Sequence, residues 1–174
     1  VTNRSDTGVE MIAAAVGPAS LTEIRDTCSA AELTTKRIAL RPLAAASLYL
    51  INRPSNSGND TVLIDLLADD AEIVVAREGR VIFVRTVRMP TGDAARGRAL
   101  GGELRRSLVA CGSSGSLDRV ILWGRQEVHA NDMKMLSEAS GSTVEMIDPF
   151  DLVDVDAKAK ADLPEHVGRL APLV

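Results

Sequence analysis

The sequence predicts an α/β domain in which three antiparallel strands come first and helices then alternate with strands. Short apolar runs rich in β-branched residues follow one another between residues 61 and 89, with a Glu78-Gly79-Arg80 turn before the last. A helical repeat of leucines begins at Asp93. Two further apolar runs, at 120–123 and 144–147, flank a second helical pattern. The expected order from residue 61 is therefore βββαβαβ.

The composition is that of one soluble globular domain or two small subdomains. The 174 residues carry 20 basic and 24 acidic side chains, a net charge of −4, and 45% of them are apolar. This balance argues against nucleic-acid binding, which usually needs a basic face. The apolar stretch at 11–16 is too short for a transmembrane helix or a signal sequence. Two distant cysteines, Cys28 and Cys111, predict free thiols rather than a disulfide framework.

The region before the meander predicts a strand, a helix, a second strand and a second helix. An apolar run over 10–16 gives the first strand. Ser20 and a glutamate three residues later have the spacing of a capping box, which predicts a helix over 19–33. Residues 35–40 alternate weakly, as a strand does, and residues 43–50 form an Ala-rich helical run.

The third strand of the meander and the helix after it supply most of the expected core. Alternation in the strand places every second side chain on one face, and these are Val81, Phe83, Arg85, Val87 and Met89. In the helix over 93–111, Gly101-Gly102 is interpreted as close packing against the sheet, with a ligand at a helix N-terminus as the alternative. The core is expected to contain Val62, Ile64, Leu66, Ile73, Val75, Ile82, Val84, Leu104, Leu108, Ile121 and Ile147.

This order of elements is typical of a ribonuclease-H-like or actin-like core, in which parallel strands extend one side of an antiparallel sheet. We expect that core over 61–150. The βαβα segment, 9–51, is expected to form an edge subdomain or to extend the same sheet, and 151–174 a C-terminal tail or helix. Topology by itself does not give function.

One stretch also resembles a known family. The segment VLIDLLADDAEIVVAREGRVIFVRTV, residues 62–87, is similar to the centre of the PilM family, and the matching positions are Asp65, Gly79, Phe83 and Arg85. Four weaker similarities occur in the family's order, at 11–51, 120–124, 144–150 and 166–174.

The resemblance implies a fold and a function. PilM relatives are actin-like ATPase-fold proteins of type IV pilus assembly, with relatives in competence and type II secretion. For this chain the resemblance implies a non-catalytic cytoplasmic scaffold, peripheral at the inner membrane. The scaffold is expected to bind a peptide or domain of an inner-membrane pilus or secretion protein. The family begins with a first phosphate-binding hairpin that nothing before Val9 supplies, so the chain resembles the second half of the fold. The alternative is an ATP-binding ATPase whose site needs the missing half.

The same resemblance assigns two cofactor positions. Asp65 corresponds to the carboxylate of the second phosphate hairpin, and Gly124 to the glycines on the adenosine side. Leu67 stands where a glycine is expected, so we interpret Asp65 as a strand-end residue that bonds a local amide. We expect no cofactor for this chain, with ATP and magnesium only in a longer protein. No catalytic residue is indicated, and the histidines His129 and His166 have no cluster of metal ligands around them.

Candidate partner-binding residues are arginines. Arg85 is expected to be structural, to pair with an acid such as Asp65, or to contact a partner. The basic run of the long helix is interpreted as a solvated face, with an acidic partner as the alternative; it comprises Arg96, Arg98, Arg105 and Arg106. In that alternative Arg98 and Arg105 bind a protein partner. A homodimer or a partner complex is expected rather than a ligand-binding monomer.

Overall fold

The computed structural model describes the backbone of residues 2–5, 8–53, 58–113 and 117–174. The chain divides into two compact units, Val1–Leu40 and Arg41–Val174. The first unit thus ends inside the segment 9–51, and the division of the chain proposed from the sequence stays a prediction.

The first unit contains a hairpin and one helix. Strands β1 (Thr2–Ser5) and β2 (Gly8–Met11) pair antiparallel, and helix α1 spans Pro18–Ala30. No residue of α1 is buried within the described part of the chain. Of its apolar side chains, Leu21 and Cys28 are half-buried and Ile24 is 39% exposed.

Two expectations for this unit are wrong. Ser20 does not cap α1: the helix begins at Pro18, whose fixed φ suits the first helical position, after Gly17 as the N-cap. Residues 35–40 are not a strand, because no described strand of the unit lies beside them to take up the hydrogen bonds of their backbone. The strand expected over 10–16 corresponds to β2, which ends at Met11, and residues 12–16 have no regular structure.

The second unit has the predicted order of strands and helices. After helix α2 (Arg41–Asn52) it contains β3 (Asp60–Leu66), β4 (Asp70–Arg77), β5 (Arg80–Arg88), α3 (Asp93–Ala110), β6 (Leu117–Trp123), α4 (Gln126–Ser140) and β7 (Val144–Ile147). The strands form one five-stranded sheet in the order β5-β4-β3-β6-β7. The first three are antiparallel, whereas β6 and β7 run parallel to β3. This confirms the α/β fold class and the meander.

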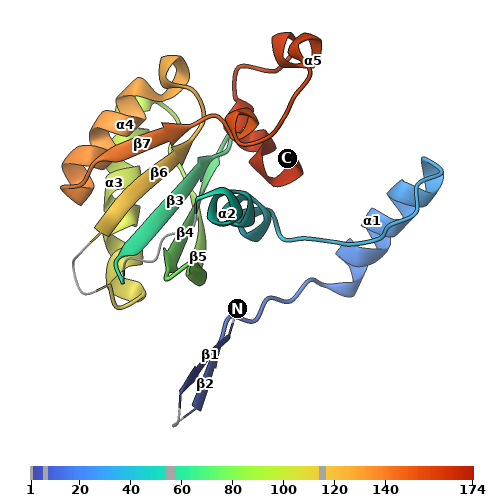
Figure 1. The fold of residues 1–174 in the computed structure, drawn as a ribbon, viewed down its shortest axis with the longest axis horizontal. Helices are drawn as coiled ribbons and strands as arrows, with labels where there is room; N and C mark the ends of the chain where they lie inside the picture. Colours follow the sequence, from blue (N-terminus) through green and yellow to red (C-terminus); the bar gives the residue numbers. More distant parts are fainter. Residues whose placement is uncertain (1, 6–7, 54–57, 114–116) are drawn as a thin grey trace. The chain divides into compact units, whose positions relative to one another are not determined.

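The sheet is covered by helices on both faces (Figure 1), with α3 and α4 side by side on one and α2 on the other. Alternation in β3 explains the division: Val62, Ile64 and Leu66 join the core under α3, while Leu63 and Asp65 point toward α2. Most of the predicted core is buried, and the exceptions are half-buried: Ile82, Val84 and Leu108. The alternation expected in β5 is interrupted by a register shift between Val75 and Ala76 of β4.

Two glycines have a structural role, one in a tight turn and one at a contact between helices. At the β4–β5 turn, Glu78 and Gly79 have φ values of 50° and 71°, the left-handed pair that a two-residue hairpin requires. At Gly101 of α3 an added Cβ would lie 2.7 Å from the Cβ of Ala139 in α4. The glycine therefore lets the two helices pack closely, so the close packing expected at this position is against α4 and not against the sheet. Gly102 has no such neighbour, and a Cβ there would meet only the side chain of Arg106.

The C-terminal part returns to the sheet. After η1 (Pro149–Asp151) and α5 (Ala157–Ala161), the 3₁₀ helix η2 (Val167–Leu173) packs against α2, β3 and β6. Val167 and Ala171 are buried in this contact. Within the described ranges no helix has both the length and the hydropathy needed to cross a membrane.

Candidate functional site

Three side chains form a polar row across the three middle strands of the sheet, at the carboxyl ends of β3 and β6 and on the face that α2 covers. Asp65 of β3 lies opposite Glu72 of β4 in the antiparallel register, and Trp123 ends the neighbouring strand β6. Asp65 is 3% exposed and Glu72 is 6% exposed. All three line one small void with Ala45 and Ala46 of α2. The carboxyl ends of β3 and β6 meet here, and open α/β sheets bind ligands at such a position.

Arg41, the first residue of α2, neutralises part of this row. Its Nη2 donates to Oδ2 of Asp65, and its Nη1 donates to the carbonyl of Arg169 in η2 at 2.8 Å. Its Nε lies 3.2 Å from Oε2 of Glu72, an ion-pair distance without the angle of a hydrogen bond. One guanidinium thus connects α2, both acids and η2. Asp65 does not bond a local amide as expected, because this cation from a distant helix reaches it.

Burial controls the protonation of the two acids. It raises the pKa of Asp65 to about 6, although the neighbouring Arg41 acts in the opposite direction. It also raises the pKa of Glu72, again against the effect of Arg41. Arg169 and His129 are the other positive or potentially positive groups that influence Asp65. Asp65 therefore changes its charge around pH 6 rather than near pH 4.

A second buried cluster lies between α3 and α4. Nδ1 of His129 is 3.1 Å from Oδ2 of Asp132, and Arg96 donates to both oxygens of that carboxylate, at 3.3 Å and 3.0 Å. Burial raises the pKa of Asp132, but the hydrogen bonds from His129 and Arg96 outweigh it and hold that pKa below its ordinary value. His129 has non-helical angles and bends α4. The His166 ring stacks obliquely on it, with centroids 5.9 Å apart.

Gly124 is the second predicted cofactor residue, and the structure places it at the same sheet edge as Asp65. Its φ is +144°, and a Cβ added there would lie 2.5 Å from Cδ2 of His129. Its amide donates to the carbonyl of Ile147 at 3.0 Å. The missing side chain thus makes room for an imidazole of the chain itself.

At this edge Asp65 and the end of β6 are in contact with other residues of the chain itself. The carboxylate of Asp65, assigned by resemblance to the metal side, is paired with Arg41 under α2. The backbone of Trp123 is in close contact with Gly168 of η2, where an added Cβ would lie 2.4 Å from the Trp123 carbonyl oxygen. In the described residues, no group of three or more His, Cys, Asp or Glu side chains could hold a metal ion.

The predicted partner-binding arginines have different surroundings. Arg85 pairs with an acid, as one of the alternatives had it, but the acid is Glu103 of α3 at 3.1 Å and not Asp65. Asp65 is too far away because β4 separates β5 from β3 in the sheet. The solvated face expected for the basic run holds for Arg98, Arg105 and Arg106, which are exposed, but not for Arg96, which binds the buried Asp132.

Arg98 and Arg105 remain exposed. They lie on α3, and neither has an ion pair with another residue of the described part of the chain. They are seven positions apart, which places them on one side of the helix.

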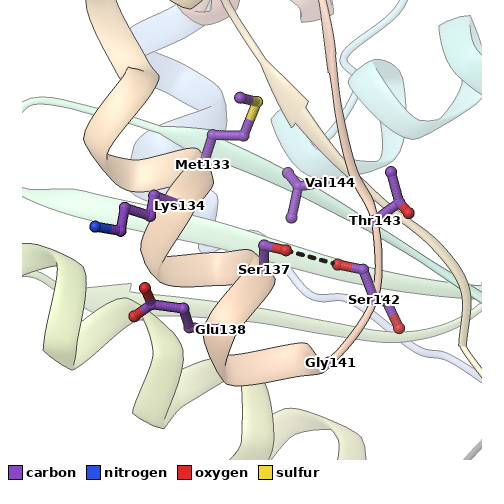
Figure 2. Close-up of a pocket in the computed structure, with 8 residues that line it drawn as sticks. All are labelled: Met133, Lys134, Ser137, Glu138, Gly141, Ser142, Thr143 and Val144. Atoms are coloured by element: carbon purple, nitrogen blue, oxygen red, sulfur yellow. Dashed lines mark hydrogen bonds between the residues drawn. The ribbon is translucent and has the colours of Figure 1, made fainter.

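A larger groove lies between α4 and the start of β7 (Figure 2), with a volume of about 650 Å³. Its walls mix apolar, charged and hydroxyl side chains from Met133, Lys134, Ser137, Glu138, Gly141, Ser142, Thr143 and Val144. Ser137 donates to the carbonyl of Ser142 at 3.1 Å across it. No residue that the sequence singled out lines this groove.

Sequence reasoning missed Arg41, Glu72 and Asp132 as members of these clusters. Arg41 and Glu72 left a weak signal, since each is a charged residue inside or beside an otherwise apolar segment, whereas Asp132 stands in a polar helix and left none. The signal says that a partner is needed but does not say which residue supplies it.

Comparison with solved structures identifies the fold. A chain of a "PilM-PilN type IV pilus biogenesis complex" superposes with a TM-score of 0.63 at 20% identity, covering 87% of this chain and 54% of that one. This chain therefore spans about half the length of the matched chain. Neither a protein-family model nor a curated protein sequence matches the chain.

Two weaker similarities carry no argument by themselves. A ROK hexokinase from Thermus thermophilus matches with a TM-score of 0.44 at 21% identity, over 51% of this chain and 33% of that one. A Bacteroides thetaiotaomicron protein with an actin-like ATPase fold and unknown function matches with a TM-score of 0.46 at 11% identity, over 71% and 44%. The chain has the PilM-like, actin-like fold that its order of elements and its sequence resemblance together predict.

Proposed function

We propose that this chain is a non-catalytic assembly scaffold that binds a cytoplasmic peptide or domain of an inner-membrane pilus or secretion protein. The observation that carries the proposal is the fold match over 87% of the chain to a chain of a PilM–PilN complex. That complex is a pilus biogenesis assembly by its own description. Location at the cytoplasmic side of the inner membrane belongs to the same proposal.

The state of the central row supports a scaffold rather than an ATPase. A nucleotide phosphate needs backbone amides that it can approach closely and a carboxylate free to hold magnesium. Here Leu67 stands at the turn after Asp65, and Arg41 holds the carboxylate. Binding of MgATP would have to break this buried ion pair, which costs several kcal/mol when one partner is left uncompensated.

We predict that MgATP does not bind the chain with a dissociation constant below about 1 mM, which corresponds to about −4 kcal/mol. Thermal unfolding with and without 1 mM MgATP is the measurement, and no rise in the unfolding temperature is expected. A concentration-dependent rise that needs magnesium and disappears in Asp65→Asn would support the ATPase alternative instead.

The exposed arginines of α3 offer a surface for an acidic partner segment. Arg98 and Arg105 lie on one side of the helix with Gly102 between them, and the guanidinium of Arg106 lies next to that glycine. Arginine is favoured at interfaces because its planar head binds carboxylates in pairs of hydrogen bonds. We propose that these two residues fix the register of the bound segment. In this proposal Arg85 stays paired with Glu103 and makes no direct contact with the segment.

Charge reversal tests this surface. We predict that Arg98→Glu with Arg105→Glu weakens binding of an acidic partner peptide by about tenfold and reduces its dependence on salt. The probe is the N-terminal cytoplasmic peptide of the PilN protein from the same genome, measured by fluorescence anisotropy. Lys158→Glu on α5 is the control, since Lys158 is exposed and remote in sequence. Equal affinities of the double variant and the control would remove α3 from the interface.

A further inference from the structure

The polar row under α2 contains more hydrogen-bonding groups than the protein itself satisfies. Oδ1 of Asp65, Oε2 of Glu72 and Nε1 of Trp123 are buried, and none of them has a hydrogen-bond partner among the described residues. All three residues line the same void, which α2 closes with Ala45 and Ala46. Oε2 of Glu72 still has its ion pair with Nε of Arg41, whereas the Asp65 oxygen and the indole N–H have no partner among the described residues. An unsatisfied buried polar group costs about 1–3 kcal/mol, so these two beside each other require an explanation.

We propose that one water molecule is bound in this void and bridges Trp123, Asp65 and Glu72. About 10 Å³ of the void is open to a water-sized sphere, which is near the minimum that holds a single water. Buried waters make about three hydrogen bonds, so one water can serve the two unsatisfied groups and also the Glu72 carboxylate.

The pattern of donors and acceptors selects water over a cation. The indole N–H of Trp123 can only donate, and it therefore needs an acceptor. A water oxygen accepts this hydrogen bond while its two protons are donated to the carboxylate oxygens of Asp65 and Glu72. A metal or ammonium ion offers no acceptor and would leave the indole unsatisfied. The role of the water is to complete the closed core where a ligand would otherwise enter.

The chain provides its own probe, because Trp123 is its only tryptophan. In ¹⁵N-labelled protein a single indole N–H signal therefore reports on the void. We expect a cross-peak between this proton and water in a rotating-frame experiment, with the sign of a dipolar contact and opposite to that of chemical exchange. The absence of a cross-peak of that sign would overturn the proposal.

One nearby hydroxyl could imitate the signal. The ring of Tyr49 lies edge-on to that of Trp123 with centroids 6.4 Å apart, and its hydroxyl proton exchanges with water. The cross-peak must therefore persist in Tyr49→Phe. Its loss in that variant would attribute the signal to the phenol and overturn the proposal.

A pair of matched substitutions on α2 locates the water. Ala45→Val fills the void and is expected to abolish the cross-peak, whereas Ala44→Val, the same change at a position that does not line the void, is expected to retain it. Amide dispersion in the same spectra checks folding. A folded Ala45→Val variant that keeps the cross-peak contradicts the assignment, and if that variant does not fold, the wild type and Tyr49→Phe decide.

Discussion

Gly168→Ala is expected to lower the free energy of unfolding by about 3 kcal/mol, because its new methyl group has no space. A Cβ at this position of η2 would lie 2.4 Å from the carbonyl oxygen of Trp123 and 2.8 Å from its carbonyl carbon. Both are backbone atoms of a central strand, which cannot turn away as the end of a side chain can. The added methyl group would push η2 away from the sheet and would also break the hydrogen bond from Arg41 to the carbonyl of Arg169.

The same substitution at Gly102 is the matched control. A Cβ there would meet only the guanidinium of Arg106, no closer than 3.6 Å. Alanine is favoured over glycine inside a helix, so Gly102→Ala is expected to raise the free energy of unfolding by about 1 kcal/mol. Urea unfolding followed by Trp123 fluorescence measures both variants. If Gly168→Ala were as stable as the wild type, the close contact between η2 and β6 would be contradicted.

The ionisation of Asp65 is expected to give the second large effect. Its pKa is about 6 in the folded chain, against 3.8 as the ordinary value. The folded state therefore holds this proton more tightly than the unfolded state, and its stabilising contribution is present at low pH and lost as the pH rises. The loss takes place between about pH 4 and 6 and amounts to roughly 3 kcal/mol in full.

Asp65→Asn isolates this contribution. We predict that between pH 4 and pH 8 the wild type loses roughly 2 kcal/mol of unfolding free energy relative to Asp65→Asn. Asp69→Asn is the control, because its side chain is 58% exposed in the turn of the same hairpin. A wild-type difference that is constant with pH would mean that Asp65 does not ionise in the environment described here.

Local patterns were sufficient to predict much of the fold. The bounds of β7 are those expected, and α3 ends one residue before the predicted end. Both elements are marked by apolar periodicity and by their own turn residues, which are local properties of the sequence. The strand expected over 35–40 failed because a strand depends on a neighbour, and its alternation alone could not provide one.

The site could be predicted only in part, because its key contacts are distant in sequence. Asp65 could be identified through the family resemblance, but its partner Arg41 comes from a helix 24 residues away. Which helix covers that end of the sheet is a property of the tertiary fold. Likewise, His129 and His166 come close only because η2 returns to the sheet edge.

Titration of the chain with the cytoplasmic N-terminal peptide of the PilN protein, with and without 1 mM MgATP, tests the central claim most directly. Isothermal titration calorimetry measures the affinity in both conditions. A scaffold whose central row is closed by Arg41 is predicted to give saturable binding with the same dissociation constant in both. Binding that appears only with MgATP would contradict the account in favour of an ATPase, and no binding in either condition would contradict the proposed partner.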